Sequence, residues 1–452
     1  MNLKDKNIVV LGLAVSGVST AKAINRLGAN ITITDMKKKE ELVEDIKKLE
    51  GIKVNYVLGS NDVDVDSIDL IIKNPGVPLN IPLLNSAREK GIEIITDIEL
   101  ASRLSNNPMI AITGTNGKTT TTTLIGEIFK NSGQNPHVTG NIGVGILWEL
   151  VNSSENDVFV IETSSFQLES TFAFKPKISI ILNVTPDHIN WHGTFDNYVN
   201  AKKKIFNNQD KEDYTILNYD DKILSKLEDE INSNLIYFST DSSLKRGVYI
   251  DGEYIVVNDG KQIIEVLPYS EVGLPGKHIL QDALAATCAA WIMGVDIEII
   301  AKTLREFKGV EHRLKFVEEI NGVSFYNDSK GTNPDSSINA VKAIKSPIIL
   351  IAGGMDKGSD FTEFIESFNG KVKALVLLGE TAEKIKKTAI SHGFNNIYIV
   401  EDMKRAVKKS YELSSSGDNI LLSPACASWD MYKNFEVRGE DFVNEVKGLR
   451  RA

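Results

Sequence analysis

Short apolar runs alternate with amphipathic helical patterns along most of the chain. Near the start, apolar runs at 7–11 and 31–34 flank a glycine-bearing turn and a helical pattern over 18–27. A period of two residues that gives way to a period near 3.6 predicts strand, loop and helix in succession. This alternation predicts a small parallel α/β domain that ends near Asp97.

The middle of the chain contains a second set of strand patterns. The runs at 109–113, 158–162 and 178–184 are almost entirely apolar and lead straight into polar loops. Such strands are typical of a parallel sheet that is buried on both faces. Shorter strands follow over 214–267, and the Asp251-Gly252 pair between two of them indicates a hairpin turn.

A third α/β pattern begins after a boundary near residue 310. The runs SPIILIAGG, KALVLLGE, NIYIV and NILLSPA alternate with helical segments, which predicts a second open sheet with helices on its faces. We therefore expect three domains, over residues 1–97, 98–309 and 310–452. The first and last are Rossmann-like, and the central one has a parallel sheet.

Composition narrows the class of protein. Apolar residues make up 42% of the 452 residues and charged residues 25%, which is typical of a globular chain. The net charge of −10 gives no general attraction to nucleic acid or to an anionic membrane. Two distant cysteines, no membrane-length apolar stretch and no signal-peptide pattern lead us to expect a cytoplasmic protein with no membrane partner.

The strongest chemical motif is AITGTNGKTT at 111–120. A strand that leads into a glycine-bearing loop and a helix forms a cradle of backbone N–H groups for phosphate oxygens. Lys118 is expected to reach the phosphates, and the hydroxyl of Thr119 to bind Mg²⁺. The usual spacing has a glycine five residues before Gly117, but this chain has Ile112 there. A chance match is the alternative, and the strand-loop-helix context disfavours it.

Two further polar residues follow predicted strands of the central sheet. Glu162 ends the run at 158–162, and His188 follows the run at 178–184. The carboxyl ends of parallel strands form the edge where ligands bind in open α/β sheets. Glu162 is therefore a candidate Mg²⁺ ligand, and His188 a candidate for binding metal or phosphate. The alternatives are a solvated strand end for Glu162 and a surface or structural role for His188.

Lys202 lies on the apolar side of a predicted helix at 195–206. A lysine that faces inward is costly to keep charged, so its amine could react or bind. The alternative is snorkelling, in which the ammonium reaches water along its own stem. The pattern alone favours snorkelling.

The first domain nearly contains a dinucleotide-binding fingerprint. Gly12, Ala14 and Gly17 match G-x-G-x-x-G except at the middle position, and Asp35 ends the second strand. The missing glycine is the one that lets the backbone approach a pyrophosphate, so Ala14 weakens an NAD-binding interpretation. A nucleotide could still bind by its sugar and base near Val15, Ser16 and Asp35.

Seven motifs, taken together, are similar to those of one enzyme family. They are GTNGKTT (114–120), GNIG (140–143), ETSSFQL (162–168), NVTPDH (183–188), EHR (311–313), NDSKGTN (327–333) and SPACASWDMYKNFEVRG (423–439). With them the chain resembles a Mur ligase, and the last two motifs resemble those of the members that add D-glutamate. The matches extend from Gly12 to Gly439.

This resemblance implies a function. The chain would be an ATP-dependent ligase that adds D-glutamate to UDP-N-acetylmuramoyl-L-alanine through an acyl phosphate, in cytoplasmic synthesis of peptidoglycan precursors. Its first domain would bind the UDP-sugar, its central P-loop domain ATP and Mg²⁺, and its last domain the amino acid. We expect a monomer. The family also carries a carbamylated lysine at the position of Lys202, which reverses the preference for snorkelling.

The resemblance also implies roles for individual residues. Four would be catalytic: Lys118, Glu162, His188 and Lys202. The metal ligands would be Thr119, Glu162, His188 and the carbamate of Lys202. ATP would be bound by Gly114, Thr115, Asn116, Gly117, Lys118, Thr119, Thr120, Arg313, Asp328 and Lys330. The sugar nucleotide and D-glutamate would be bound by Val15, Ser16, Asp35, Gly76, Asn141, Thr332, Lys357, Ser428 and Phe435.

The chain departs from the family pattern at Ile279 and Asp282, where asparagines are usual. Three other interpretations remain open. One is a different ligase of the Mur or folylpolyglutamate type, which would differ in the pocket of the third domain. Another is a regulator that binds sugar nucleotides without catalysis, which is disfavoured by the intact Lys118, Glu162, His188 and Lys202. An NAD oxidoreductase is the most distant.

Overall fold

The computed structural model describes residues 1–274, 276–344 and 347–450. Two compact units emerge from its internal contacts. The first unit comprises Met1–Val184, Phe195–Glu271 and Gln281–Arg305, and the second comprises Thr185–Thr194, Val272–Leu280 and Glu306–Ala452. The α/β class predicted from the sequence is confirmed. Three separate sheets are present, two in the first unit and one in the second.

The first sheet has five strands, all parallel, in the order β3-β2-β1-β4-β5. Its strands are β1 (Asn7–Leu11), β2 (Asn30–Asp35), β3 (Val54–Leu58), β4 (Leu70–Lys73) and β5 (Glu93–Ile95), and its helices are α1 (Val15–Arg26), α2 (Val43–Lys47) and α3 (Pro82–Glu89). The strand order reverses between β1 and β4, and ligands bind at such a switch point in open α/β sheets. This is the Rossmann-like arrangement that the sequence predicts.

The turn from β1 into α1 depends on two glycines. A Cβ at Gly17 would lie 2.2 Å from the carbonyl oxygen of Gly12, so no side chain fits there. Gly12 has a φ of +97°, which a residue with a Cβ rarely adopts. The close approach of the turn and the helix explains why this segment has two of the three fingerprint glycines. The helix begins at Val15, three residues before the predicted start.

The central sheet has nine strands, in the order β14-β13-β12-β11-β10-β9-β6-β8-β7. They are β6 (Met109–Thr113), β7 (Pro136–Gly140), β8 (Val158–Glu162), β9 (Ile178–Ile181), β10 (Tyr214–Asn218), β11 (Asn234–Ser239), β12 (Gly247–Asp251), β13 (Tyr254–Asn258) and β14 (Ile263–Pro268). The strands from β7 to β12 in this order are all parallel, and β13 pairs antiparallel with both β12 and β14. The predicted parallel sheet is confirmed, and β6 lies between β8 and β9 as the direct neighbour of both.

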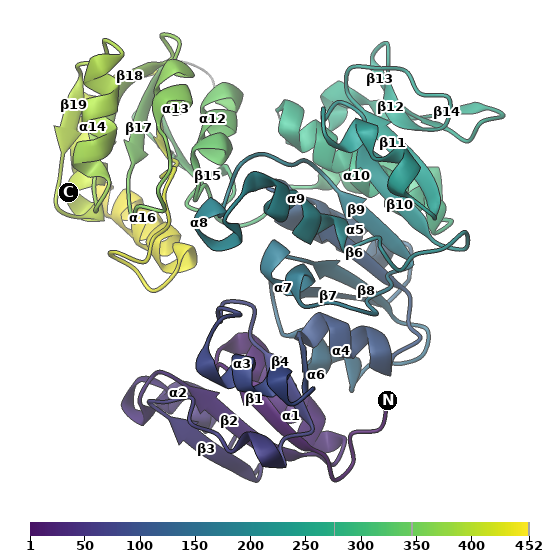
Figure 1. Cartoon of the computed structure of the whole chain (residues 1–452). Coiled ribbons are helices and arrows are strands. Elements are labelled where there is room, and N and C mark those ends of the chain that lie inside the picture. The colour runs from purple at the N-terminus through teal and green to yellow at the C-terminus, as the bar shows by residue number, and fades with distance from the viewer. Residues whose placement is uncertain (275, 345–346, 451–452) are drawn as a thin grey trace. The chain divides into compact units, whose positions relative to one another are not determined.

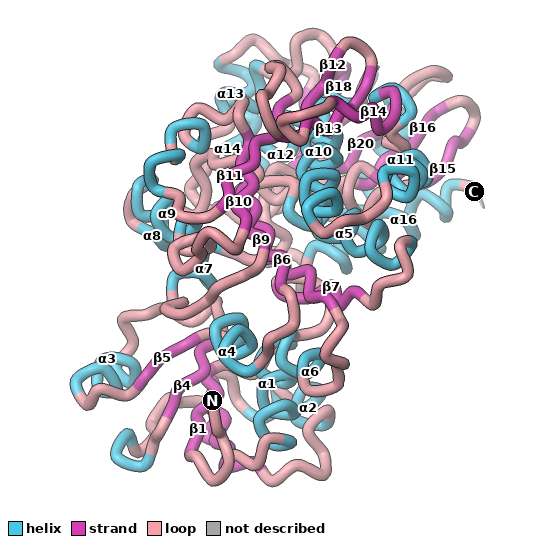
Figure 2. Tube along the Cα trace, turned by 90° about the vertical axis from the view of Figure 1, so that its right-hand side faces the viewer, coloured by secondary structure: helices cyan, strands magenta, loops and turns pink. Residues whose placement is uncertain are grey.

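Helices cover both faces of the central sheet. Figure 2 shows α7 and α9 on one side of its strands and α5, α10 and α11 on the other. The five helices are α5 (Lys118–Asn131), α7 (Ser165–Glu169), α9 (Phe195–Lys203), α10 (Lys277–Ile292) and α11 (Ile297–Glu306). The same part of the chain also contains α4 (Asp97–Leu104) and α6 (Ile146–Leu150). Burial on both faces accounts for the continuous apolar character of β6, β8 and β9.

The predicted hairpin is present, but its turn is displaced by one residue. Asp251 pairs with Tyr254, so the two connecting residues are Gly252 and Glu253 rather than Asp251 and Gly252. Gly252 has a φ of +57°, and glycine adopts this conformation without strain. Asp251 extends β12 because its backbone completes the ladder with Tyr254.

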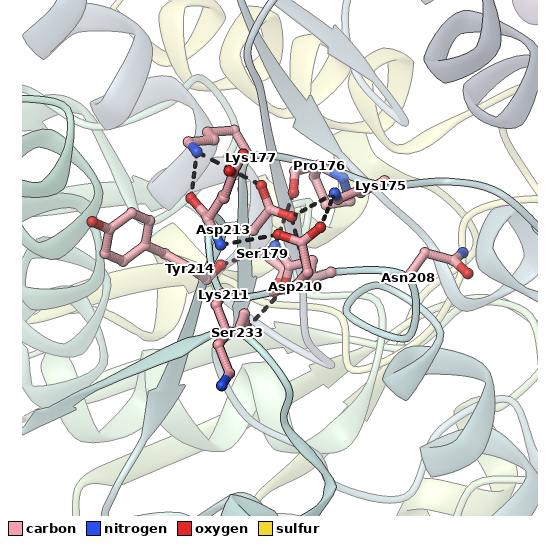
Figure 3. Close-up of polar contacts among 12 residues, drawn as sticks. Lys175, Pro176, Lys177, Ser179, Asn208, Asp210, Lys211, Asp213, Tyr214 and Ser233 are labelled. Carbon is pink, nitrogen blue, oxygen red and sulfur yellow. Dashed lines mark hydrogen bonds and ion pairs between the residues drawn. The ribbon is translucent and has the colours of Figure 1, made fainter.

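A polar network fixes the amino ends of β9 and β10 (Figure 3). The buried amide of Gln209 donates to the carbonyls of Pro176 and Tyr214, and its oxygen accepts from the hydroxyls of Ser179 and Thr215. This network anchors the chain shortly after α9, the helix that carries Lys202. It lies at the opposite edge of the sheet from the phosphate loop, because parallel strands begin at one edge and end at the other.

Ion pairs join Lys175 to the loop between α9 and β10. Lys175 lies 2.6 Å from Asp210 and 3.3 Å from Asp213 (Figure 3). The two aspartates also accept backbone N–H groups in this loop. Exposed ion pairs contribute little to stability, so the buried Gln209 hydrogen bonds are the stronger anchor.

The second unit contains a six-stranded sheet in the order β15-β16-β20-β17-β18-β19. Its strands are β15 (Lys315–Ile320), β16 (Val323–Asn327), β17 (Ile348–Ala352), β18 (Val372–Leu377), β19 (Ile397–Ile399) and β20 (Asn419–Leu422). Its helices are α8 (Ile189–His192), α12 (Pro334–Ala343), α13 (Thr362–Glu366), α14 (Ala382–Ser391), α15 (Met403–Leu413) and α16 (Phe435–Leu449). All strands except β15 are parallel. The first residue of the SPIILIAGG run, at position 346, lies outside the described residues.

Both cysteines are buried and free. Burial raises the pKa of the Cys426 thiol to about 12, so the thiolate is scarcely populated at neutral pH. In the described part of the chain, no helix combines the length and the apolar character needed to cross a membrane.

Candidate functional site

The phosphate loop joins β6 to α5, and the helix begins at Lys118 as predicted. Gly117 has a φ of +84°, and a Cβ at this position would lie 2.2 Å from Oδ1 of Asp282. The loop therefore requires glycine at 117 both for its backbone conformation and for space. Asp282, one of the two departures from the family pattern, lies directly against the loop.

Asn183 holds the loop from the neighbouring strand end. Its Oδ1 accepts hydrogen bonds from the backbone N–H groups of Thr115 (3.1 Å) and Asn116 (2.9 Å), and its Nδ2 donates to the carbonyl of Asn116 (3.1 Å). Because these two amides bind Asn183, the amides that suit a phosphate are those of the first turn of α5, which have no carbonyl partner within the helix. Sequence analysis missed this role, although Asn183 is a polar residue near the end of the apolar run at 178–184.

Thr119 and Glu162 meet at the carboxyl edge of β6 and β8. The Thr119 hydroxyl donates to Oε2 of Glu162 at 2.7 Å, and the Nδ2 of Asn141 donates to Oε1 at 3.0 Å. Glu162 is almost completely buried. Glu162 lies close to the phosphate loop because β6 and β8 are adjacent strands.

Lys202 points into the protein beside the same loop. Its side chain is buried, with 2% of the residue exposed, so the snorkelling interpretation is wrong. Its Nζ donates to the carbonyl oxygen of Gly114 at 2.8 Å and lies 4.6 Å from the ring centre of Tyr198. Lys118 donates to the same Gly114 oxygen at 2.9 Å. Tyr198, which sequence analysis also missed, bonds to the Thr115 hydroxyl at 3.1 Å.

The predicted residues of the first domain gather around the end of β1. Asp35 accepts hydrogen bonds from the backbone N–H groups of Leu13 (2.7 Å) and Lys37 (2.9 Å). The Ser16 hydroxyl donates to the buried carboxylate of Asp97 at 2.6 Å. Val15, at the start of α1, is exposed.

The remaining predicted residue of that domain, Gly76, follows β4. Its backbone N–H donates to the side-chain oxygen of Asn74 at 3.2 Å. A Cβ at Gly12 would lie 2.9 Å from the Cβ of Asn74, so the loop after β4 packs against the turn after β1. The structure therefore brings Ser16, Asp35 and Gly76 to one edge of the first sheet.

The loop that carries Asn141 packs against α1. The Ser19 hydroxyl donates to the carbonyl of Gly145 at 2.7 Å and accepts from the backbone N–H of Trp148 at 3.1 Å. A Cβ at Gly145 would lie 2.4 Å from the Cβ of Ser19. This contact holds the Asn141 loop beside the helix that carries Val15 and Ser16.

In the second unit, Asp328 follows β16 and is completely buried. Its Oδ1 accepts from the backbone N–H of Leu314 (3.1 Å) and its Oδ2 from the Ser423 hydroxyl (2.7 Å). Burial raises the pKa of Asp328 to about 6, although Arg313 and these hydrogen bonds oppose the shift. Arg313 donates to the Ser336 hydroxyl at 2.9 Å. The buried Nε of Arg313 finds no hydrogen-bond partner among the described residues.

Lys357 and His188 both lie within 4 Å of the partly buried carboxylate of Asp187. Lys357 Nζ is 3.8 Å from Oδ1, and His188 Nε2 is 3.5 Å from Oδ2. Asn333 also donates to this carboxylate, at 3.1 Å. Burial raises the pKa of Asp187, but Lys357, His188 and the hydrogen bonds outweigh it and hold the pKa below its usual value. His188 belongs to the second unit, with a φ of +53°.

The other predicted residues of the second unit follow three adjacent parallel strands, β16, β20 and β17. Lys330 and Thr332 come after β16, Ser428 after β20 and Lys357 after β17. The Nζ of Lys330 lies 5.0 Å from the ring centre of Phe435, the first residue of α16. These segments therefore meet at one sheet edge, as candidate binding segments do in open α/β folds.

The structure divides the predicted residues between the two units. The first unit contains Val15, Ser16, Asp35, Gly76, Gly114, Thr115, Asn116, Gly117, Lys118, Thr119, Thr120, Asn141, Glu162 and Lys202, and the second contains His188, Arg313, Asp328, Lys330, Thr332, Lys357, Ser428 and Phe435. Each set clusters at carboxyl ends of strands, which is the arrangement expected of binding sites.

The Thr119 and Glu162 pair fits a magnesium ion. A hydroxyl and a carboxylate are the hard oxygen ligands that Mg²⁺ prefers, and this ion keeps several waters or phosphate oxygens beside one or two protein ligands. Within the described residues, no three His, Cys, Asp or Glu side chains gather closely enough to hold a metal ion. The first unit would thus supply part of a coordination shell, and a phosphate and water would supply the rest.

Three family profiles match successive parts of the chain. They are described as Mur ligase MurD-like, N-terminal domain (residues 6–96), Mur ligase middle domain (112–290) and Mur ligase, glutamate ligase domain (312–426). Together they account for the three predicted parts of the fold.

Full-length relatives and solved structures point the same way. The chain is 50% identical to proteins named UDP-N-acetylmuramoylalanine–D-glutamate ligase from Alkaliphilus oremlandii and Clostridioides difficile, over 100% of both sequences in each case. Its fold is similar to that of UDP-N-acetylmuramate–alanine ligase from Thermotoga maritima, with a TM-score of 0.65 and 20% identity over 98% of this chain and 99% of the other. A pseudomurein peptide ligase type C from Methanothermus fervidus gives a TM-score of 0.62 with 19% identity, over 98% and 100% of the two chains. The chain belongs to the Mur ligase family of ATP-dependent amide-bond ligases.

Proposed function

We propose that the chain joins the amino group of D-glutamate to the alanine carboxyl group of UDP-N-acetylmuramoyl-L-alanine in the cytoplasmic synthesis of peptidoglycan precursors. The observation that carries the chemistry is the convergence of Lys118, Thr119 and Glu162 at one edge of the central sheet. The choice of substrates is supported by the names of relatives that are 50% identical over the full chain.

The reaction needs ATP because an amine does not displace oxide from a carboxylate at a useful rate. In the first step, an oxygen of the substrate carboxylate attacks the γ-phosphorus, and the bond from that phosphorus to ADP breaks. In the second step, the amine of D-glutamate attacks the acyl carbon, the carbon–oxygen bond to phosphate breaks, and the amine loses a proton. The products are the amide, ADP and phosphate.

The residues of the phosphate loop suit the first step. The first-turn amides of α5 and the ammonium of Lys118 would bind phosphate oxygens and offset the negative charge that develops during transfer. Thr119 and Glu162 would hold Mg²⁺, which supplies Lewis-acid stabilisation of phosphate charge when bound. The predictions that Thr120, Arg313, Asp328 and Lys330 also contact ATP remain predictions.

Lys202 is proposed to act as a carbamate. In that reaction its neutral amine attacks carbon dioxide, a nitrogen–carbon bond forms, and one proton is released. The change replaces a buried cation by an anion next to Lys118. The shared hydrogen bonds to Gly114 support this proposal, because two ammonium groups on one carbonyl repel each other and the carbamate would attract Lys118 instead. The role of His188 as a further metal ligand remains a prediction.

The two substrates of the amide bond are assigned to different sheets. Val15, Ser16, Asp35, Gly76 and Asn141 are proposed to bind the sugar nucleotide. Thr332, Lys357, Ser428 and Phe435 are proposed to bind D-glutamate, for which Lys357 supplies a partly buried positive charge that suits a carboxylate. We expect a monomer to suffice.

The direct test is the release of phosphate from ATP in the presence of Mg²⁺ and UDP-N-acetylmuramoyl-L-alanine. D-glutamate, L-glutamate, L-alanine and a diamino acid are compared as acceptors, with a Lys118→Ala variant as the inactive control. We expect release with D-glutamate alone. Release with another amino acid would preserve the ligase chemistry and overturn the substrate, and no release with any acceptor would contradict the proposed function.

A further inference from the structure

The strand β4 of the first sheet ends in a buried lysine. The other three residues of this strand are Leu70, Ile71 and Ile72, and all four are buried. Only 1% of Lys73 is exposed. An ammonium group that is removed from water costs several kcal/mol unless hydrogen bonds replace its hydration. An apolar residue would complete this strand at no such cost, so the lysine needs a separate explanation.

The ammonium of Lys73 donates hydrogen bonds to the backbone of the loop that follows it. Its Nζ donates to the carbonyl oxygens of Asn74 (3.1 Å), Pro75 (3.0 Å) and Val77 (2.7 Å). These three acceptors match the three N–H groups of an ammonium. The loop thus curls around the charge, and Gly76 lies between two of the bonded carbonyls.

Two buried or partly buried carboxylates balance this charge. Burial lowers the pKa of Lys73 to about 8, and the negative charges of Glu169 and Asp97 oppose the shift. Asp97 is the residue that accepts the Ser16 hydroxyl. The buried cation and its counter-charge therefore contact two segments of the proposed sugar-nucleotide site, the Gly76 loop and the start of α1.

The loop lies at the switch point of the sheet. Lys73 pairs with Leu11 at the end of β1, and the backbone N–H of Asn74 donates to the Leu11 carbonyl at 2.8 Å. Figure 1 shows β4 beside β1, where the strand order reverses. A loop at this place is well sited to meet a ligand.

We propose that Lys73 is a positioning residue for the sugar nucleotide: its ammonium fixes the backbone of residues 74–77 in the conformation that binds this substrate. The inference rests on the proposed function, which assigns the sugar nucleotide to the first sheet. Lys73 itself is enclosed by its own loop and acts through Gly76 and its neighbours. Loss of the ammonium would leave three partly buried carbonyls without their donor, and the loop would rearrange to hydrate them.

The test compares Lys73→Met and Lys73→Gln with the parent chain. Methionine keeps an unbranched side chain that is one atom shorter and removes all three donors, whereas glutamine keeps two donors without charge. Lys6→Met is the matched control, because Lys6 is in the same domain but 52% of its side chain is exposed, in an ion pair with Asp69. The first measurement is hydrogen–deuterium exchange of residues 74–80 without any ligand. The second is calorimetric titration with UDP-N-acetylmuramoyl-L-alanine and, separately, with a non-hydrolysable ATP analogue.

We expect Lys73→Met to exchange the loop amides faster while β1 and β4 stay protected. Its Kd for the sugar nucleotide should rise by about tenfold, which is roughly 1.4 kcal/mol, and its Kd for the ATP analogue should stay within about twofold. Lys73→Gln should fall between Met and the parent, and Lys6→Met should match the parent.

The proposal is overturned if a folded Lys73→Met chain keeps both loop exchange and sugar-nucleotide affinity. It is also overturned if both Lys73 variants lose protection throughout the first sheet, because the residue would then stabilise the domain as a whole. A parent chain that does not bind the sugar nucleotide would contradict the proposed function instead. The exchange experiment would still decide whether Lys73 orders the loop.

Discussion

Lys118 and Lys202 donate hydrogen bonds to the same acceptor, the carbonyl oxygen of Gly114, at 2.9 and 2.8 Å. Their two charges are therefore separated by no more than the sum of these distances. At an effective dielectric constant near 20, the repulsion between them is about 3 kcal/mol. A modification that makes Lys202 anionic would turn this repulsion into attraction, which links the geometry of the loop to the proposed carbamate.

Lys202→Ala should lower kcat by about 10² to 10³, because it removes the carbamate that is proposed to act beside the phosphates. Short carboxylic acids such as formate or acetate should restore part of the activity by occupying the space of the carbamate. Lys203→Ala is the matched control, since Lys203 pairs with Glu230 instead and should keep activity near that of the parent. Full activity of Lys202→Ala without added acid would contradict the carbamate.

Glu162→Gln should lower kcat/KM by about 10² or more and raise the Mg²⁺ concentration needed for half-maximal rate. The variant keeps the shape of the side chain but loses the charge that suits a metal ion. Thr119→Val should show the same Mg²⁺ dependence, since it removes the hydroxyl that meets Glu162. The measurement is phosphate release over a range of Mg²⁺ concentrations.

The control for these two changes is Glu155→Gln, which alters an exposed glutamate that precedes β8. It should leave the Mg²⁺ dependence unchanged. If Glu162→Gln needed no more Mg²⁺ than the parent, Glu162 would not be a metal ligand.

Gly117→Ala should weaken ATP binding by at least about tenfold. The added Cβ would meet Oδ1 of Asp282 at 2.2 Å in a residue with a φ of +84°, so the loop must move. Gly133→Ala is the matched control: its φ is +83°, but nothing lies within 4 Å of the added carbon. Both variants carry about 1 kcal/mol of backbone strain, and only Gly117→Ala adds the clash. Equal ATP affinities in titration calorimetry would refute the steric argument.

His137 should stabilise the fold in acid and lose that effect as the pH rises. Its ring nitrogens lie 2.8 Å from Glu149 and 2.9 Å from Asp157. Burial lowers the pKa of His137, but the two carboxylates outweigh it and raise the pKa above 6.5. A folded-state pKa above the unfolded value gives stability that is fully present below the unfolded pKa and is lost as the pH passes through the folded pKa.

His137→Gln should therefore lower Tm by about 1–3 °C at pH 6, and the difference from the parent should shrink as the pH rises through the folded pKa of His137. The difference is measured by thermal unfolding of both proteins, followed by circular dichroism, at pH 6 and at a pH above the folded pKa of His137. A Tm difference that grows with pH would have the wrong sign.

The sequence by itself determined the features that depend on neighbours along the chain. Apolar runs of strand length identified several strands in each of the three sheets, but not β3, β5, β7, β15 or β16. The glycine spacing at 114–117 identified the loop before α5. The helical period over 195–206 was enough to place Lys202 on the inner face of α9. Each of these signals lies within about a dozen residues, where backbone geometry sets which side chains share a face.

The tertiary structure decided the features that depend on residues far apart in sequence. Only strand pairing brings Glu162 to Thr119, Asn183 to the phosphate loop and Asp97 to Ser16, over separations of 43, 67 and 81 residues. The burial of the Lys202 side chain was also decided by the tertiary structure. Periodicity gives the direction of a side chain, whereas burial depends on the helices and strands that enclose it, and these enclose the amine completely enough to prevent snorkelling. The same holds for Lys73, which is simply the end of a strand in the sequence and acquires its partners only when its loop folds back over it.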